Sequence, residues 1–129
     1  SNNSLDFFEE MKVMAIGNKV SVSDPEVMTP RQVLAAATAG GAKAQRRDDC
    51  GSIRAGNRAD IIVLDISVPN MHPVHDMINN LVYSCSGRSV VMTMVDGRVL
   101  YENGEFHTID IEKTVYEAEK ATDNILRKL

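Results

Sequence analysis

Apolar residues recur at spacings of three and four through the first part of the chain, which predicts an amphipathic helix. The stripe consists of Leu5, Phe8, Met11, Ala15 and Ile16. Asn3 or Ser4 is suited to cap this helix, with Asp6 in its first turn, where the helix dipole favours an anion. Three further apolar residues widen the stripe: Phe7, Val13 and Met14. We therefore expect this helix to pack against neighbours on two sides.

A second helix is predicted to open at residue 30. Thr29 is a preferred N-cap, Pro30 suits the first helical position, and Gln32 completes a capping box. The expected buried face consists of Val33, Leu34, Ala37 and Thr38. The pair Gly40-Gly41 is expected to stop the helix, although residues 42–44 are able to add one more turn.

The periodicity changes in the middle of the chain. Residues 59–66 form a short run rich in isoleucine and valine, which predicts a strand buried on both faces. Residues 89–94 and 98–101 are also strand-like, and Asp96-Gly97 between them is a strong hairpin signal. A second turn signal, Asn103-Gly104, would return a further short strand.

Two segments complete the predicted elements. Residues 76–83 form either a short helix or a packed loop. Residues 110–129 predict a helix capped by Asp110, with Glu112 in its first turn. Its apolar face consists of Ile111, Val115, Ala118, Thr122, Ile125 and Leu129.

Composition and net charge argue against some classes of function. A chain of 129 residues with 43% hydrophobic and 25% charged residues is typical of one ordinary soluble domain. The net charge of −4 argues against nucleic-acid binding, because the basic pair Arg46-Arg47 is followed at once by Asp48-Asp49. No apolar run approaches the ~20 residues that a membrane-spanning helix needs. For Cys50 and Cys85 we expect free thiols in a cytoplasmic protein, while a single disulfide stays open.

The most informative pattern is a pair of short segments. Residues 51–63 (GSIRAGNRADIIV) combine a tight turn, a second glycine and an acidic residue before a strand, and residues 90–100 (VVMTMVDGRVL) form a strand, a turn and a strand. Four further motifs lie at residues 1–11, 38–44, 73–76 and 80–84. Together, and in their order along the chain, these motifs resemble the C-terminal part of the metal-dependent amidohydrolases, the deaminase and chlorohydrolase group.

The resemblance implies an α+β fold that forms the C-terminal portion of a (β/α)8-barrel hydrolase. Its expected parts are two barrel-end helices, a small, mainly antiparallel sheet that is half of a composite β-sandwich, and a C-terminal helix. They correspond to residues 1–48, 49–109 and 110–129. The partner of such a fragment would be the N-terminal barrel portion of the same protein.

The resemblance also implies a divalent metal, zinc or iron, in the parent enzyme, where it would activate a water molecule. The family takes its ligands from a His-x-His pair, two later histidines and an aspartate at the end of the last barrel strand. None of these can be placed here, and that aspartate would precede Ser1. The histidines present, His72, His75 and His107, stand at other positions. The fragment alone is therefore predicted to hold no metal and to be inactive.

The loop after the eighth strand faces the active site in barrels of this kind. Ser1, Asn2 and Asn3 would therefore border the substrate, with the Ser1 hydroxyl as the most direct contact. The implied reaction is hydrolytic deamination of a purine or nucleoside derivative, a small heterocyclic substrate. Halide displacement from a triazine ring is the alternative, because chlorohydrolases share the same C-terminal signature.

Other polar residues favour structural roles. His72, His75 and Asp76 suggest a metal site, but Pro73 disfavours one shared helix face, so we expect His75 or Asp76 to bond to the backbone. Cys85 has no histidine at a recognisable spacing, which disfavours a nucleophile.

The carboxylates Asp60 and Asp65 lie at opposite ends of one predicted strand, where they cannot share a catalytic cleft. Asp60 is expected to accept hydrogen bonds from the turn at Gly56, and Asp96 belongs to the hairpin.

A non-catalytic, oligomerising β module is the second interpretation. Strands that lose their partners leave open edges, and open edges bind other strands. The helix that starts near Leu5 also has more apolar surface than so short a chain covers. We therefore expect a homo-oligomer, including a domain-swapped one.

Overall fold

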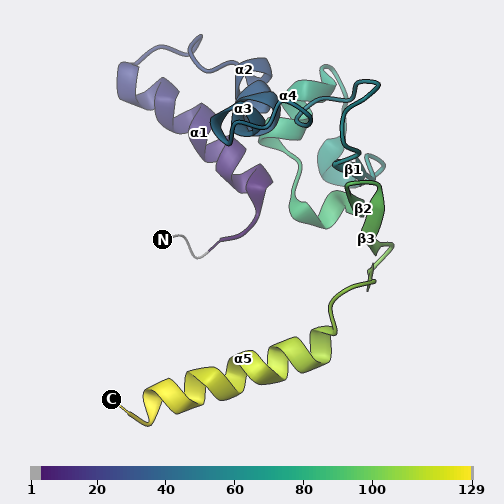
Figure 1. The fold of residues 1–129 in the computed structure, drawn as a ribbon. Coiled ribbons are helices and arrows are strands. Elements are labelled where there is room, and N and C mark those ends of the chain that lie inside the picture. Colours follow the sequence, from purple (N-terminus) through teal and green to yellow (C-terminus); the bar gives the residue numbers. More distant parts are fainter. Residues whose placement is uncertain (1–3, 129) are drawn as a thin grey trace.

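The computed structural model describes residues 4–128, in which a helical body carries a small sheet at one edge and a last helix lies apart (Figure 1). Its helices and helical turns are α1 (Phe7–Val22), α2 (Pro30–Ala35), η1 (Ala36–Gly40), α3 (Gly41–Ala44), η2 (Pro69–Met71), α4 (Met77–Tyr83), η3 (Gly87–Ser89) and α5 (Ile111–Leu126). The strands are β1 (Ile61–Leu64), β2 (Val90–Val95), β3 (Arg98–Glu102) and β4 (Glu105–Phe106). The predicted α+β class is confirmed.

Helix α1 is capped by Asp6, and the prediction that Asp6 lies in its first turn is wrong. The Asp6 side chain accepts a hydrogen bond from the backbone N of Phe8 at 3.0 Å. Ser4, the other candidate cap among the described residues, accepts from the backbone N of Asp6 at 3.3 Å. Asp6 takes the cap because its backbone is extended (φ −83°, ψ 105°), which aims the carboxylate at the free N–H groups of the first turn.

One face of α1 is buried, and it is the centre of the predicted stripe. Phe8, Met11 and Ala15 are buried against α2 and α4. In contrast, Phe7 and Val13, which were expected to contact a second neighbour, are 60% and 65% exposed. The described residues therefore supply a partner for only one side of α1.

The second helix starts as predicted but does not stop where predicted. Thr29 and Gln32 form a complete capping box, with Pro30 at the first turn. Gly40 and Gly41 both keep right-handed helical backbone angles, and the π-helical turn η1 joins α2 to α3. The expected stop at this pair is therefore wrong, because glycine tolerates helical angles as well as left-handed ones. The alternative, one more turn at residues 42–44, is confirmed by α3, and the chain turns away only after Ala44.

The core lies where three helices meet. It is formed by Phe8, Met11, Ala15, Val33 and Val82, which come from α1, α2 and α4. Helix α4 resolves the choice between helix and loop at residues 76–83 in favour of a helix. Asp76 caps it by accepting from the backbone N of Ile78 and Asn79.

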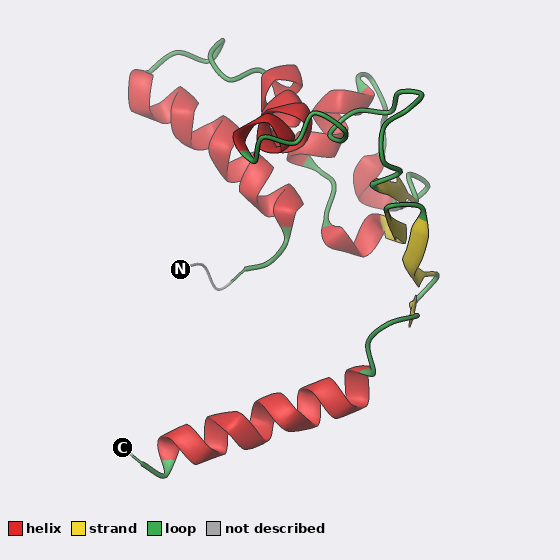
Figure 2. Ribbon diagram, viewed as in Figure 1, coloured by secondary structure: helices red, strands yellow, loops and turns green. Residues whose placement is uncertain are grey.

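The sheet is an antiparallel meander in the order β1-β2-β3-β4. Both predicted hairpin turns are present. Asp96 and Gly97 have φ values of 52° and 77°, and Asn103 and Gly104 have 47° and 94°, so each pair occupies the left-handed region that tight hairpins require. Figure 2 shows the strands as a narrow strip beside the helices.

Strand β1 differs from its prediction in length and burial. It runs from Ile61 to Leu64 rather than through residues 59–66, and it is an edge strand that pairs only with β2. Ile62 and Val63 are 50% and 43% exposed, so the expected burial on both faces is wrong within the described residues. Residues 4–128 form a single four-stranded sheet, so no second sheet from this range covers the strand.

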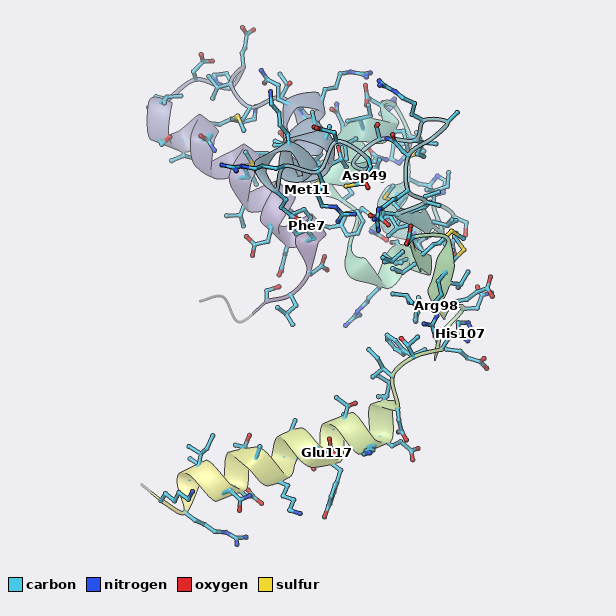
Figure 3. The ribbon with its side chains drawn as sticks, viewed as in Figure 1. Phe7, Met11, Asp49, Arg98, His107 and Glu117 are labelled. Atoms are coloured by element: carbon cyan, nitrogen blue, oxygen red, sulfur yellow. The ribbon has the colours of Figure 1, made fainter. Side chains whose placement is uncertain are left out.

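Helix α5 confirms the last predicted helix, and Asp110 caps it by accepting from the backbone N of Lys113 at 3.0 Å. Every residue of α5 is exposed. In Figures 1 and 3 the helix, which carries Glu117, lies away from the body and joins it through one extended linker. Between residues 4 and 128, no helix is both long and apolar enough to cross a bilayer.

Candidate functional site

The predicted substrate-contact residues Ser1, Asn2 and Asn3 lie outside the residues that the structure describes. The neighbouring residues that are described form a tight hydrogen-bonded group at the start of α1. Ser4 Oγ donates to Glu9 Oε2 at 2.6 Å while it accepts from the backbone N of Asp6 at 3.3 Å. The backbone N of Glu10 donates to the backbone O of Asp6 at 3.2 Å. The chain is thus held firmly where it enters the helix.

The Asp6 carboxylate joins this group to the start of the sheet. Its Oδ1 accepts from the backbone N of Phe8 at 3.0 Å, and its Oδ2 accepts from the backbone N of Gly87 at 2.9 Å. Asp6 and Gly87 are 81 positions apart in the sequence. Gly87 opens the turn η3, which leads directly into β2. One carboxylate therefore fixes the start of α1 against the entry to the central strand.

The residues from 4 to 128 supply no metal site. No three His, Cys, Asp or Glu side chains in this range come together in a way that could hold a metal ion. Asp76 is used as the cap of α4, which confirms that a carboxylate in the His72–Asp76 segment bonds to the backbone. The metal that the family resemblance implies therefore does not fit these residues.

Asp60 has different partners from those predicted. Its Oδ1 accepts from the backbone N of Asp96 at 2.8 Å, and Arg47 donates to its Oδ2 at 3.1 Å. The expected bonds to the turn at Gly56 are wrong, because the hairpin turn lies closer to the start of β1 and offers a free N–H. The backbone N of Gly97 also donates to the backbone O of Ala59, at 3.1 Å.

Asp65, at the other end of β1, bonds locally. Its carboxylate accepts from the hydroxyl and the backbone N of Ser67, at 2.7 and 2.8 Å. The hydrogen bond from the Ser67 hydroxyl, followed by that from the Ser67 backbone N, lowers the pKa of Asp65 below its ordinary value. Each carboxylate is thus occupied at its own end of the strand, as expected for two structural residues.

An ion-pair network beside the sheet was missed in the sequence. Arg58 donates to Asp49 at 2.7 Å and to Asp96 at 3.4 Å, next to the Arg47–Asp60 pair. The hydrogen bond from Arg58 lowers the pKa of Asp49. The sequence does contain a signal for this network, because residues of opposite charge lie on both sides of the loop at residues 51–56. Figure 3 shows Asp49 between the helices and the strands. The bond from Arg58 to Asp96 fastens the end of the loop to the hairpin.

Cys50 and Cys85 are free thiols, as predicted. Both are partly buried, and the Cys85 Sγ lies 3.7 Å from the backbone O of Ser86. Neither thiol therefore takes part in a metal cluster or a disulfide of the described chain.

An open groove of about 550 Å³ lies along the sheet. It is lined by Gly87, Val90, Thr93, Leu100, Tyr101, Gly104, Phe106, Thr108 and Ile109. The rings of Tyr101 on β3 and Phe106 on β4 contact each other in a tilted arrangement, with centroids 4.9 Å apart. These side chains carry no acid–base pair, so the groove suits packing rather than catalysis.

Comparison with known proteins gives the chain a clear family context. The sequence profile described as "Amidohydrolase family" matches residues 1–100. The 5'-deoxyadenosine deaminase of Methanosarcina mazei is 39% identical over 129 residues, which are 100% of this chain and 30% of that protein. The 5-methylthioadenosine/S-adenosylhomocysteine deaminase of Dictyoglomus thermophilum is 38% identical over 128 residues, 99% of this chain and 30% of that protein.

Two solved structures are also similar to this chain. An adenosine deaminase from Xanthomonas campestris with bound zinc has a TM-score of 0.96 and 32% identity, over 100% of this chain and 29% of that one. Atrazine chlorohydrolase TrzN from Arthrobacter aurescens, complexed with zinc, has a TM-score of 0.76 and 25% identity, over 88% of this chain and 25% of that one. The chain thus spans about 30% of the length of the curated relatives it matches.

Proposed function

The chain belongs to the amidohydrolase family, and we propose that it contributes to an enzyme that deaminates a purine nucleoside by hydrolysis. In this reaction water adds to the ring carbon that bears the amino group, the carbon–nitrogen bond breaks, and ammonia leaves. The observation that carries the proposal is the match to the Xanthomonas adenosine deaminase over the whole chain, with a TM-score of 0.96. The relatives named as deaminases of 5'-deoxyadenosine and of 5-methylthioadenosine support the same chemistry.

The metal of this enzyme is proposed to be zinc, which is bound in the Xanthomonas structure. When bound, such a metal would lower the pKa of a water molecule and so supply hydroxide at neutral pH. Because the residues from 4 to 128 do not fit a metal, its ligands would come from parts of the enzyme outside this range. The 129 residues alone are accordingly proposed to be inactive.

The contribution of this chain is proposed to lie on the substrate side. Ser1, Asn2 and Asn3 would border the nucleoside, and the Ser1 hydroxyl would donate to or accept from one of its polar atoms. The hydrogen bonds of Ser4 and Asp6 support this role, because they fix the start of α1, to which these three residues are joined in the sequence.

The remaining proposals concern the division of the chain into parts, its association with other chains and its location in the cell. We keep residues 1–48, 49–109 and 110–129 as the divisions between barrel helices, composite sandwich and C-terminal helix. The exposed apolar residues of α1 and the edge strand β1 support association, either with the barrel portion of the same protein or with a second copy. A cytoplasmic location also stays a prediction.

The test is an activity assay on the full-length enzyme with its metal. Ammonia should be released from adenosine, 5'-deoxyadenosine or 5'-methylthioadenosine, and no chloride should be released from atrazine. Chloride release without deamination would move the function to the chlorohydrolase alternative, to which the TrzN likeness points.

The isolated 129-residue chain is the matched control. We expect it to release no ammonia and, by elemental analysis, to bind no stoichiometric zinc. One zinc per chain would contradict the proposed origin of the ligands outside residues 4–128.

A further inference from the structure

We draw no further inference here: the strongest candidate, the apolar stripe of Ile111, Val115 and Ile125 along α5, is an exposed helix face, and nothing within residues 4–128 shows what covers it.

Discussion

The helices α1 and α5 are similar in length and in their N-cap but differ completely in their surroundings. Each has 16 residues, and each is capped by an aspartate with almost the same extended backbone, ψ 105° at Asp6 and 102° at Asp110. Helix α1 buries Phe8, Met11 and Ala15, whereas α5 buries none of its described residues. Local sequence signals therefore specify a helix and its apolar face without specifying the partner of that face.

The position of α5 is consistent with a solved relative, because the match to the Xanthomonas adenosine deaminase covers 100% of this chain, α5 included, with a TM-score of 0.96. In this chain the apolar residues Ile111, Val115 and Ile125 of α5 are 43%, 51% and 62% exposed. A 16-residue helix without tertiary contacts is marginal in water. In the 129-residue chain alone, α5 is therefore expected to be only marginally stable.

The largest expected effect comes from truncating one apolar residue in each helix of the 129-residue chain. Met11→Ala should lower the free energy of unfolding by about 2–5 kcal/mol, because Met11 is 6% exposed in the core and its loss leaves a cavity. Ile125→Ala should change it by less than about 0.5 kcal/mol, because Ile125 is 62% exposed. Urea denaturation followed by circular dichroism measures both.

The control for this pair is Val13→Ala, on the exposed side of α1, which should behave like Ile125→Ala. Equal losses for Met11→Ala and Ile125→Ala would mean that α5 packs on the body in solution. That result would remove the contrast between the two helices.

This contrast explains which parts of the fold were predictable. Caps, turns and periodicity are local, so Thr29, Asp110 and both hairpin turns were identified correctly. Burial depends on neighbours, so it was predicted less well. The isoleucine- and valine-rich run at residues 59–66 has the composition of a covered strand, yet β1 is a half-exposed edge.

The same reasoning applies to the candidate site. Asp6 was recognised as favourable to the helix dipole, but nothing near it in the sequence points to Gly87, 81 positions later. Asp60 was likewise assigned to its nearest turn, whereas its partners are Arg47 and Asp96. Long-range hydrogen bonds of single side chains leave no periodic signal, so only the folded chain reveals them. The predicted contacts Ser1, Asn2 and Asn3 lie outside the described residues and stay a prediction.

A smaller effect is expected from removing the two aspartate caps of the 129-residue chain. Asp6→Ala should destabilise the fold by about 1–2 kcal/mol, because it removes the cap of a packed helix together with the bond to Gly87. Asp110→Ala should leave the unfolding midpoint unchanged and lower only the helical signal, since α5 is not coupled to the core. A shift of the midpoint in Asp110→Ala would contradict that independence.

The smallest effect is electrostatic and is confined to the body. The hydrogen bond from Arg58 keeps the pKa of Asp49 below its ordinary value of 3.8 in the folded chain. A carboxylate with a lowered folded pKa binds fewer protons than in the unfolded chain. Its contribution to stability is therefore complete well above pH 3.8 and is lost as the pH falls through the lower, folded value. Asp49→Asn should accordingly make unfolding slightly less sensitive to acid, as measured by urea midpoints across that range.

Arg58→Gln provides the matched test of this interpretation, because it removes the donor and leaves the Asp49 carboxylate in place. In the Arg58→Gln background, Asp49→Asn should produce little further change in the acid sensitivity of the midpoint. An undiminished change would mean that the Arg58–Asp49 pair, with its 2.7 Å separation, is not what links the stability of the body to pH. The helical signal of α5 should change in none of these variants, because Asp49 and Arg58 flank the loop at residues 51–56 and lie outside that helix.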